Sequence, residues 1–210
     1  MDVEGNNSLI GLKVGIGRDL RDDIYLPSRG HEFDVTYEQV TGDEDFGILE
    51  GSHTQYWTLH EDLAGRRTIL AIKLLGGTTF SDAPPFEKFY AGGTHRYGLR
   101  GFEFRGVSAR GLRTNVPFIE RKDPVGSDWI FLANGEVAVP LVGESVSWLG
   151  FIDSGTIDTG RYRASIGTGI QIKIPQSFGQ MPMRFELAAP FSKGGEDETQ
   201  VFSFSMGGLF

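Results

Sequence analysis

Apolar and polar residues alternate along most of this chain, so that every second side chain falls on the same face of an extended backbone. The clearest case runs from Tyr162 to Ile174, where tyrosine, alanine, isoleucine and threonine alternate with arginine, serine, glycine, glutamine and lysine. The segment from Met183 to Phe191 repeats this scheme. A period of two is typical of β-strands, whereas the spacing of an amphipathic helix is nearly absent. The pattern therefore predicts an all-β protein.

We expect about nine strands, bounded by clusters of glycine, proline, aspartate or serine. Their expected positions are residues 8–19, 29–40, 46–60, 66–77, 128–142, 146–157, 162–174, 183–191 and 201–210. The strand that begins at Tyr162 exceeds the roughly 5–6 residues usual in soluble sheets and covers the ~9–11 residues of a tilted membrane-spanning strand. The connection from about Thr78 to Ser127 shows no helix or strand pattern, and connections of that length are usually functional.

The alternation fits two architectures. In a water-soluble sheet the polar face is wet and the apolar face covers a core, whereas in an outer-membrane β-barrel the apolar face contacts lipid and the polar face lines the lumen. Strand length, aromatic residues at strand ends and the terminal Phe210 favour the antiparallel transmembrane β-barrel. A soluble β-sandwich that acts as a binding module is the alternative.

Composition excludes several classes of site. The 210 residues contain no cysteine, which excludes disulfides and thiolate ligands or nucleophiles. The formal net charge of -8 argues against a nucleic-acid partner. Four histidines, His31, His53, His60 and His95, have no metal-ligand spacing, and no G-x-S-x-G sequence is present. We therefore expect no metal, no cofactor and no enzymatic activity.

One stretch, FYAGGTHRYGLRGFEFRG from Phe89 to Gly106, places five glycines and several aromatic rings around Arg100. A loop that folds back into a barrel lumen would carry this arginine into a partly desolvated space, where a guanidinium must find acceptors. The alternative is an ordinary solvated loop arginine, as most loop arginines are.

These residues resemble the sixth extracellular loop of the BamA family of outer-membrane assembly proteins, also called the bacterial surface antigen family. The hallmark there is a glycine pair, a short spacer and then [VL]-R-G-[FY]. The matching residues are Gly92, Gly93, Leu99, Arg100, Gly101 and Phe102. GFIDSGTI resembles the second family motif, F-x-D-x-G, through Phe151, Asp153 and Gly155.

Further matches occur in the order in which the family has them. GRDLRDDIYLPSRGHEF resembles the D-x-R-D…P-x-x-G hairpin through Asp19, Arg21, Asp22, Pro27 and Gly30. NGEVAVPL resembles the strand after the loop, and the segments from Arg163 and Met183 resemble the last hairpin but one. FSFSMGGLF resembles the C-terminal targeting strand, which ends in an aromatic residue.

The resemblance implies a barrel of sixteen strands preceded by periplasmic POTRA repeats. Residues 1–210 would be the C-terminal part of that barrel, about nine strands, with the loop insertion at about 78–127 folded into the lumen. The N-terminal strands and the POTRA repeats are absent from this sequence. We therefore expect the chain to be a fragment of a longer protein, since an open first strand in hydrocarbon would leave backbone groups unpaired.

In the family the corresponding arginine and aspartate are paired, and strand parity agrees. Asp153 shares its face with Phe151 and Gly155, and Glu136 has inward parity on the preceding strand, so either carboxylate could pair with Arg100. We expect Gly101 to permit a tight turn and Gly155 to leave room for the loop. Phe102 and Phe151 are expected to pack around the ion pair. The alternative for Asp153 is an ordinary turn residue in the tripeptide DSG.

The C-terminal strand carries a separate hypothesis. In the family the seam between the first and last strands is short and weakly paired, and glycine weakens strands. We expect the targeting strand and seam to involve the residues Phe202, Phe204, Gly207, Gly208 and Phe210. The alternative is that the glycines only ease a tight barrel corner.

The resemblance implies a barrel in the outer membrane of a Gram-negative-type bacterium that inserts and assembles other β-barrel proteins without covalent chemistry. The implied partners are outer-membrane lipid, unfolded outer-membrane proteins as substrates, and accessory assembly lipoproteins. A two-partner-type secretion pore of the same superfamily and a membrane anchor for an N-terminal enzyme domain are the alternatives.

Overall fold

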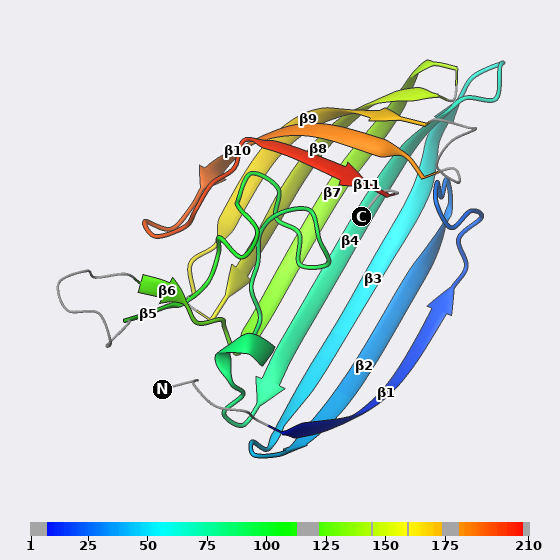
Figure 1. Ribbon diagram of the computed structural model, residues 1–210. Helices are drawn as coiled ribbons and strands as arrows, with labels where there is room; N and C mark the ends of the chain where they lie inside the picture. The colour runs from blue at the N-terminus through cyan, green and yellow to red at the C-terminus, as the bar shows by residue number, and fades with distance from the viewer. Residues whose placement is uncertain (1–7, 113–121, 144, 159, 174–180, 208–210) are drawn as a thin grey trace.

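The computed structural model describes residues 8–112, 122–143, 145–158, 160–173 and 181–207. Their alternating side chains form nine long strands of a single sheet (Figure 1). These are β1 Leu9–Asp19, β2 Gly30–Gly42, β3 Phe46–Glu61, β4 Arg67–Phe80, β7 Trp129–Val142, β8 Val146–Ile157, β9 Arg163–Ile172, β10 Met183–Ser192 and β11 Phe202–Met206. Eight expected strands are present with both ends within three residues of their expected bounds. The ninth, expected at 201–210, begins at Phe202, and residues 208–210 lie outside the described part of the chain.

Neighbours along the chain are neighbours in the sheet, in the order β1-β2-β3-β4-β7-β8-β9-β10-β11, and every pair is antiparallel. The sheet curls around the connection between β4 and β7 (Figure 1). In the described part of the chain no pairing joins β1 to β11, so the sheet is open. The expected antiparallel all-β architecture is confirmed.

The connection between β4 and β7 is more structured than its sequence indicates. It contains a 3-10 turn, Pro85–Glu87, and a small two-stranded sheet of β5 Arg110–Leu112 and β6 Lys122–Pro124. The expectation of no helix or strand in this connection was therefore wrong. Elements of three residues carry too few side chains to show a period, which explains the miss.

The outer face of the sheet is apolar. Ile152, Ile166 and Leu187 are 50%, 57% and 53% exposed, whereas the residues that alternate with them, such as Asp153 and Ser165, are buried. A water-soluble sheet would show the opposite arrangement, because its apolar face covers a core. This inversion is typical of a sheet whose outer face meets lipid.

The concave face is covered by the connection. Phe89, Leu99 and Phe102 of the loop form a buried cluster with strand residues that include Leu75 and Leu132. Burial of these side chains attaches the loop to the inner surface of β4 and β7, since removal of apolar area from water stabilises contact. No helix in the described residues is long and apolar enough to cross a membrane.

Candidate functional site

Arg100 lies at the inner surface of the sheet, where the loop brings it against β7, β8 and β10. The residue is 6% exposed. Its guanidinium donates from Nε to Asp153 Oδ2 at 2.7 Å and from Nη2 to Asp153 Oδ1 at 2.8 Å. The backbone N–H of Arg100 also donates to Asp153 Oδ2 at 3.0 Å. The fork geometry expected for this pair is present.

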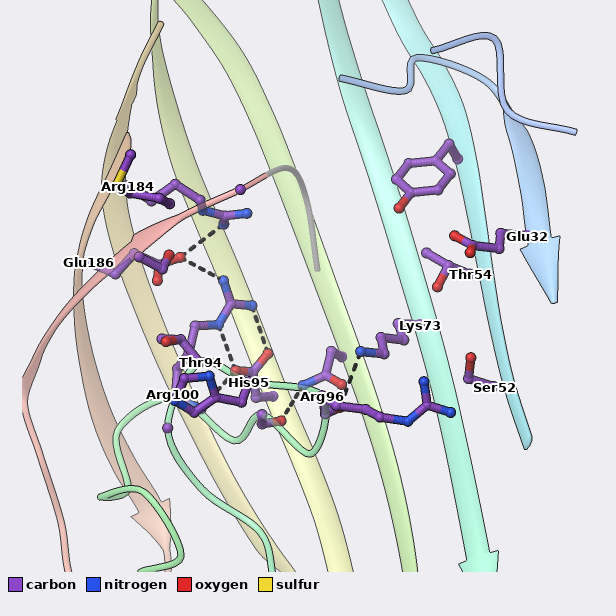
Figure 2. Close-up of a pocket in the computed structure, with 18 of the residues that line it drawn as sticks. Glu32, Ser52, Thr54, Lys73, Thr94, His95, Arg96, Arg100, Arg184 and Glu186 are labelled. Atoms are coloured by element: carbon purple, nitrogen blue, oxygen red, sulfur yellow. Dashed lines mark hydrogen bonds and ion pairs between the residues drawn. The ribbon is translucent and has the colours of Figure 1, made fainter. Parts of the chain in front are cut away.

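Two further carboxylates complete the site. Arg100 Nη1 donates to Glu136 Oε2 and, at 2.9 Å, to Glu186 Oε1. Arg184 Nη2 donates to the same two oxygens, at 2.5 Å for Glu136 and 2.8 Å for Glu186. Three buried carboxylates therefore share two guanidinium groups, and we call these five residues the lumen cluster. Figure 2 labels Arg100, Arg184 and Glu186 of this cluster.

The pKa of Arg100 responds to two opposing influences. Burial alone would lower it, but the charge of Asp153, the hydrogen bonds to that carboxylate and the charges of Glu136 and Glu186 together outweigh burial, so the pKa lies well above its ordinary value. Arg100 is charged throughout the physiological range. A buried charge of this kind needs several acceptors at once, which the three carboxylates supply.

Other contacts fix the loop around Arg100. The guanidinium carbon lies 3.5 Å from the centroid of the Phe151 ring, and Ser165 Oγ donates to the carbonyl of Arg100 at 2.5 Å. Gly101 has a φ of +92°, and a Cβ there would lie about 3.2–3.3 Å from Ser165, Ala188 and Pro190. Gly101 thus combines the turn with a close approach to β9 and β10.

The other loop residues expected at the site are present with different roles. Leu99 and Phe102 lie in the buried apolar cluster with Leu132, and Phe102 also forms an isolated bridge with Thr199. Gly92 has a φ of +123°, and a Cβ there would lie 2.0 Å from the carbonyl oxygen of Glu103. Gly93 pairs with Leu99 across this turn.

Gly155 is expected to leave room for the loop, and the atoms nearest to it in the structure lie on β7. A Cβ on Gly155 would lie 2.3 Å from a methyl group of Leu132 on β7. The absent side chain accommodates this neighbouring strand residue, which in turn packs against the loop. Parity identifies the face of a residue but not the nearest atom on that face.

Sequence reasoning missed Glu186 and Arg184. Both lie on β10, on the polar face opposite Met183 and Phe185, so their inward parity was available. Parity could not show that β10 curls far enough for Glu186 to reach the same arginine as Asp153. That proximity depends on the curvature of four successive strands.

The described part of the C-terminal strand is β11. β11 pairs with β10 over five residues, from Phe202 opposite Leu187 to Met206 opposite Met183. Phe202 and Phe204 are exposed on the outer face, and the Phe204 ring lies 5.1 Å from that of Phe185. Gly207 follows the strand, whereas Gly208 and Phe210 lie outside the described residues.

The expected hairpin motif connects β1 and β2. The Asp22 carboxylate accepts hydrogen bonds from the backbone N–H of Ser28 at 2.8 Å and of Arg29 at 3.1 Å. Burial alone would raise the pKa of Asp22. The hydrogen bonds from the Ser28 hydroxyl and from the backbone N–H groups outweigh burial, so the pKa lies below its ordinary value. Arg21 binds Asp19 at 2.7 Å, and Gly30 has a φ of +97°.

Among the described residues, no group of three or more histidine, cysteine or acidic side chains has a geometry that could hold a metal ion. The lumen cluster binds its carboxylates to arginine instead. Its chemistry is therefore electrostatic attachment of a loop to three strands.

The fold matches a solved outer-membrane barrel. The crystal structure of BamA from Haemophilus ducreyi lacking POTRA domains 1-3 superposes with a TM-score of 0.79 and 21% identity over 95% of this chain. The chain spans 42% of the length of that structure. This likeness confirms the expected BamA-type barrel fold.

The sequence comparisons identify the family. A search of the curated proteins found no match. The model of the Omp85 superfamily domain matches residues 2–210, nearly the whole chain. The chain therefore belongs to the Omp85 superfamily.

Proposed function

We propose that the protein carrying this chain inserts and assembles other β-barrel proteins in the outer membrane of a Gram-negative-type bacterium. It acts without covalent chemistry, by presenting strand edges and a lipid-facing surface. Residues 1–210 supply the C-terminal part of a larger barrel, with the loop at about 78–127 in the lumen. Its partners are outer-membrane lipid, unfolded barrel proteins and accessory lipoproteins.

The observation that carries this proposal is the short last strand. Within the described residues, β11 pairs with β10 at five positions, whereas β9 and β10 pair at nine. A short strand separates from its neighbour at a smaller free-energy cost, and a free strand edge can pair with an incoming strand by β-augmentation. The apolar outer face and the lumen cluster support a barrel that keeps its shape while this edge opens.

Each expected site residue has a role in this proposal. Arg100, Asp153 and Glu136 attach the loop, while Gly101 and Phe151 shape its contact with the wall. Gly92, Gly93, Leu99, Phe102 and Gly155 support the loop and the strands beneath it. Phe202, Phe204, Gly207, Gly208 and Phe210 form the targeting strand and the seam.

Depletion of the full-length protein in its own bacterium tests the proposal. We expect several unrelated barrel proteins to disappear from the outer membrane together. Normal levels of all of them would contradict it, and loss of one secreted protein alone would favour a secretion pore. A plasmid copy with Arg100→Ala should restore these levels poorly, whereas Arg105→Ala should restore them fully because Arg105 is exposed.

A further inference from the structure

A second set of polar contacts begins four residues before Arg100. Arg96 lies in the same loop, but its guanidinium points toward β3 and β4, away from the lumen cluster (Figure 2). Arg96 Nε and Nη2 both bind the carboxylate of Glu50 on β3. Nη2 also binds Asp34 Oδ2 on β2 at 3.1 Å. These contacts attach the loop to the opposite wall of the sheet.

Glu50 receives a second donor from the loop. The Tyr97 hydroxyl donates to Glu50 Oε2, and the Tyr97 ring packs edge-on against Phe89 with centroids 5.6 Å apart. Burial and the Glu50 hydrogen bond together raise the pKa of Tyr97, so the phenol stays protonated and able to donate. Glu50 is 7% exposed, and both of its oxygens are used by the loop.

The loop backbone is attached as well. Lys73 Nζ on β4 donates to the carbonyl of Arg96 at 3.2 Å, and Asn134 Nδ2 on β7 donates to the carbonyl of Gly98 at 3.1 Å. The segment 96–100 thus contacts β2, β3, β4, β7, β8 and β10 in succession. Residues 96–100 therefore contact six of the nine long strands described.

Burial of the Glu50 carboxylate would be energetically unfavourable if the loop did not supply its hydrogen-bond donors. A buried carboxylate that loses its partners destabilises the folded state, because its charge stays out of water without compensation. Burial alone would lower the pKa of Arg96, but the charges of Glu50 and Asp34 and the hydrogen bonds to them together outweigh burial, so the pKa is raised. A buried acid on a wall strand is therefore satisfied only while the loop occupies this position.

We propose that Arg96, Tyr97 and Glu50 form a second anchor, which makes residues 96–100 a strut across the lumen between the β2–β4 wall and the lumen cluster. Arg96 and Tyr97 are positioning residues, since they act by holding Arg100 and the loop in place. The proposal deepens the proposed function, because it assigns the residues that fix the lumenal loop while the β11 edge opens.

The 210 residues contain no cysteine, so a thiol introduced into the loop can report the position of the loop without background labelling from this part of the protein. Thr94 lines the pocket beside the strut, and Thr94→Cys introduces a thiol that can be labelled with a maleimide in the full-length protein in outer-membrane vesicles. We expect Arg96→Gln or Glu50→Gln to raise the labelling rate several-fold, because the loop leaves the wall. Arg105→Gln and Glu38→Gln, which lie outside the anchor, are the matched controls and should leave the rate unchanged.

The double variant tests the pairing itself. Arg96→Gln and Glu50→Gln both remove the shared Arg96–Glu50 ion pair, so the effect of the double variant should be smaller than the sum of the two single effects. Independent, additive effects would contradict the anchor, as would single variants that label at the rate of the parent. Tyr97→Phe keeps the ring and removes only the donor, so we expect a smaller increase.

Loop position and assembly are separate readouts. If labelling changes as expected while depletion leaves other barrels at normal levels, the anchor stands and the proposed function fails. If labelling does not change in any folded variant, the anchor is wrong, whatever the effect on assembly. Heat-modifiable gel mobility shows which variants are folded, and Glu50→Gln, which keeps the size of the side chain, serves where a larger change prevents folding.

Discussion

Arg100 is held by more acceptors than a single ion pair supplies. It forms a fork with Asp153, and its Nη1 donates to both Glu136 and Glu186, while the guanidinium lies against the ring of Phe151. An arginine can do this because its guanidinium is planar and has five donors in fixed directions. The same burial makes any replacement expensive, since the carboxylates stay in place when the cation changes.

We expect Arg100→Lys to destabilise the barrel although the charge is kept. An ammonium group cannot bind both oxygens of Asp153 in a fork and reach Glu136 and Glu186 as well. The temperature at which heat-modifiable mobility is lost should fall clearly, and Arg100→Ala should lower stability further, by about 3–5 kcal/mol. Arg105→Lys is the control, and an unchanged midpoint for Arg100→Lys would contradict the fork.

The pairing of Arg100 with Asp153 could be inferred before the structure was known, because motif and strand parity agreed. Contact between Glu136 and Arg100 was predicted from strand parity alone. Contact between Glu186 and Arg100 was not predicted, because alternation shows which face of a strand a side chain occupies but not which other faces lie close to it. Parity likewise did not show that the atom nearest to a Cβ on Gly155 would belong to Leu132.

At the scale of elements, the loop is joined to the connection between β10 and β11. Glu103 N–H donates to the carbonyl of Glu198 at 3.0 Å, Glu198 N–H to that of Gly106 at 3.1 Å, and Gln200 N–H to that of Gly101 at 3.1 Å. These are backbone bonds of a short antiparallel ladder. They tie the position of the last hairpin to the loop that carries Arg100.

Gln200→Pro should loosen this ladder. Proline removes the N–H that bonds Gly101, so the loop should open more often and its exposed Arg105 should be cut faster by trypsin added outside the cell. Gln200→Ala keeps the backbone donor and is the matched control. Equal cleavage rates for the two variants would show that the ladder does not hold the loop.

At the scale of the whole molecule, the sheet is open. In the described residues, β1 pairs with β2 alone and β11 with β10 alone, which leaves two edges. Unpaired backbone groups in hydrocarbon cost several kcal/mol each, so a sheet in a membrane needs both edges paired. The match to 42% of a larger barrel agrees with a sheet that other strands complete.

We therefore expect the 210 residues, refolded alone in detergent, to self-associate and not to form a compact monomer. Light scattering coupled to size-exclusion chromatography measures this directly. A closed barrel of known structure, refolded in parallel, controls for the detergent. A monodisperse monomer would show that the two edges can satisfy each other.

The sequence by itself determined the all-β class, the positions of nine strands and the face of each side chain. These features depend on a local period of two that every strand repeats. Only the tertiary structure decided that Glu186 and Arg184 join Arg100, and that Arg96 and Tyr97 reach Glu50 on the opposite wall. Those contacts depend on how the sheet curls and how the loop crosses it, and residues 36 to 86 positions apart carry no local signal of such proximity.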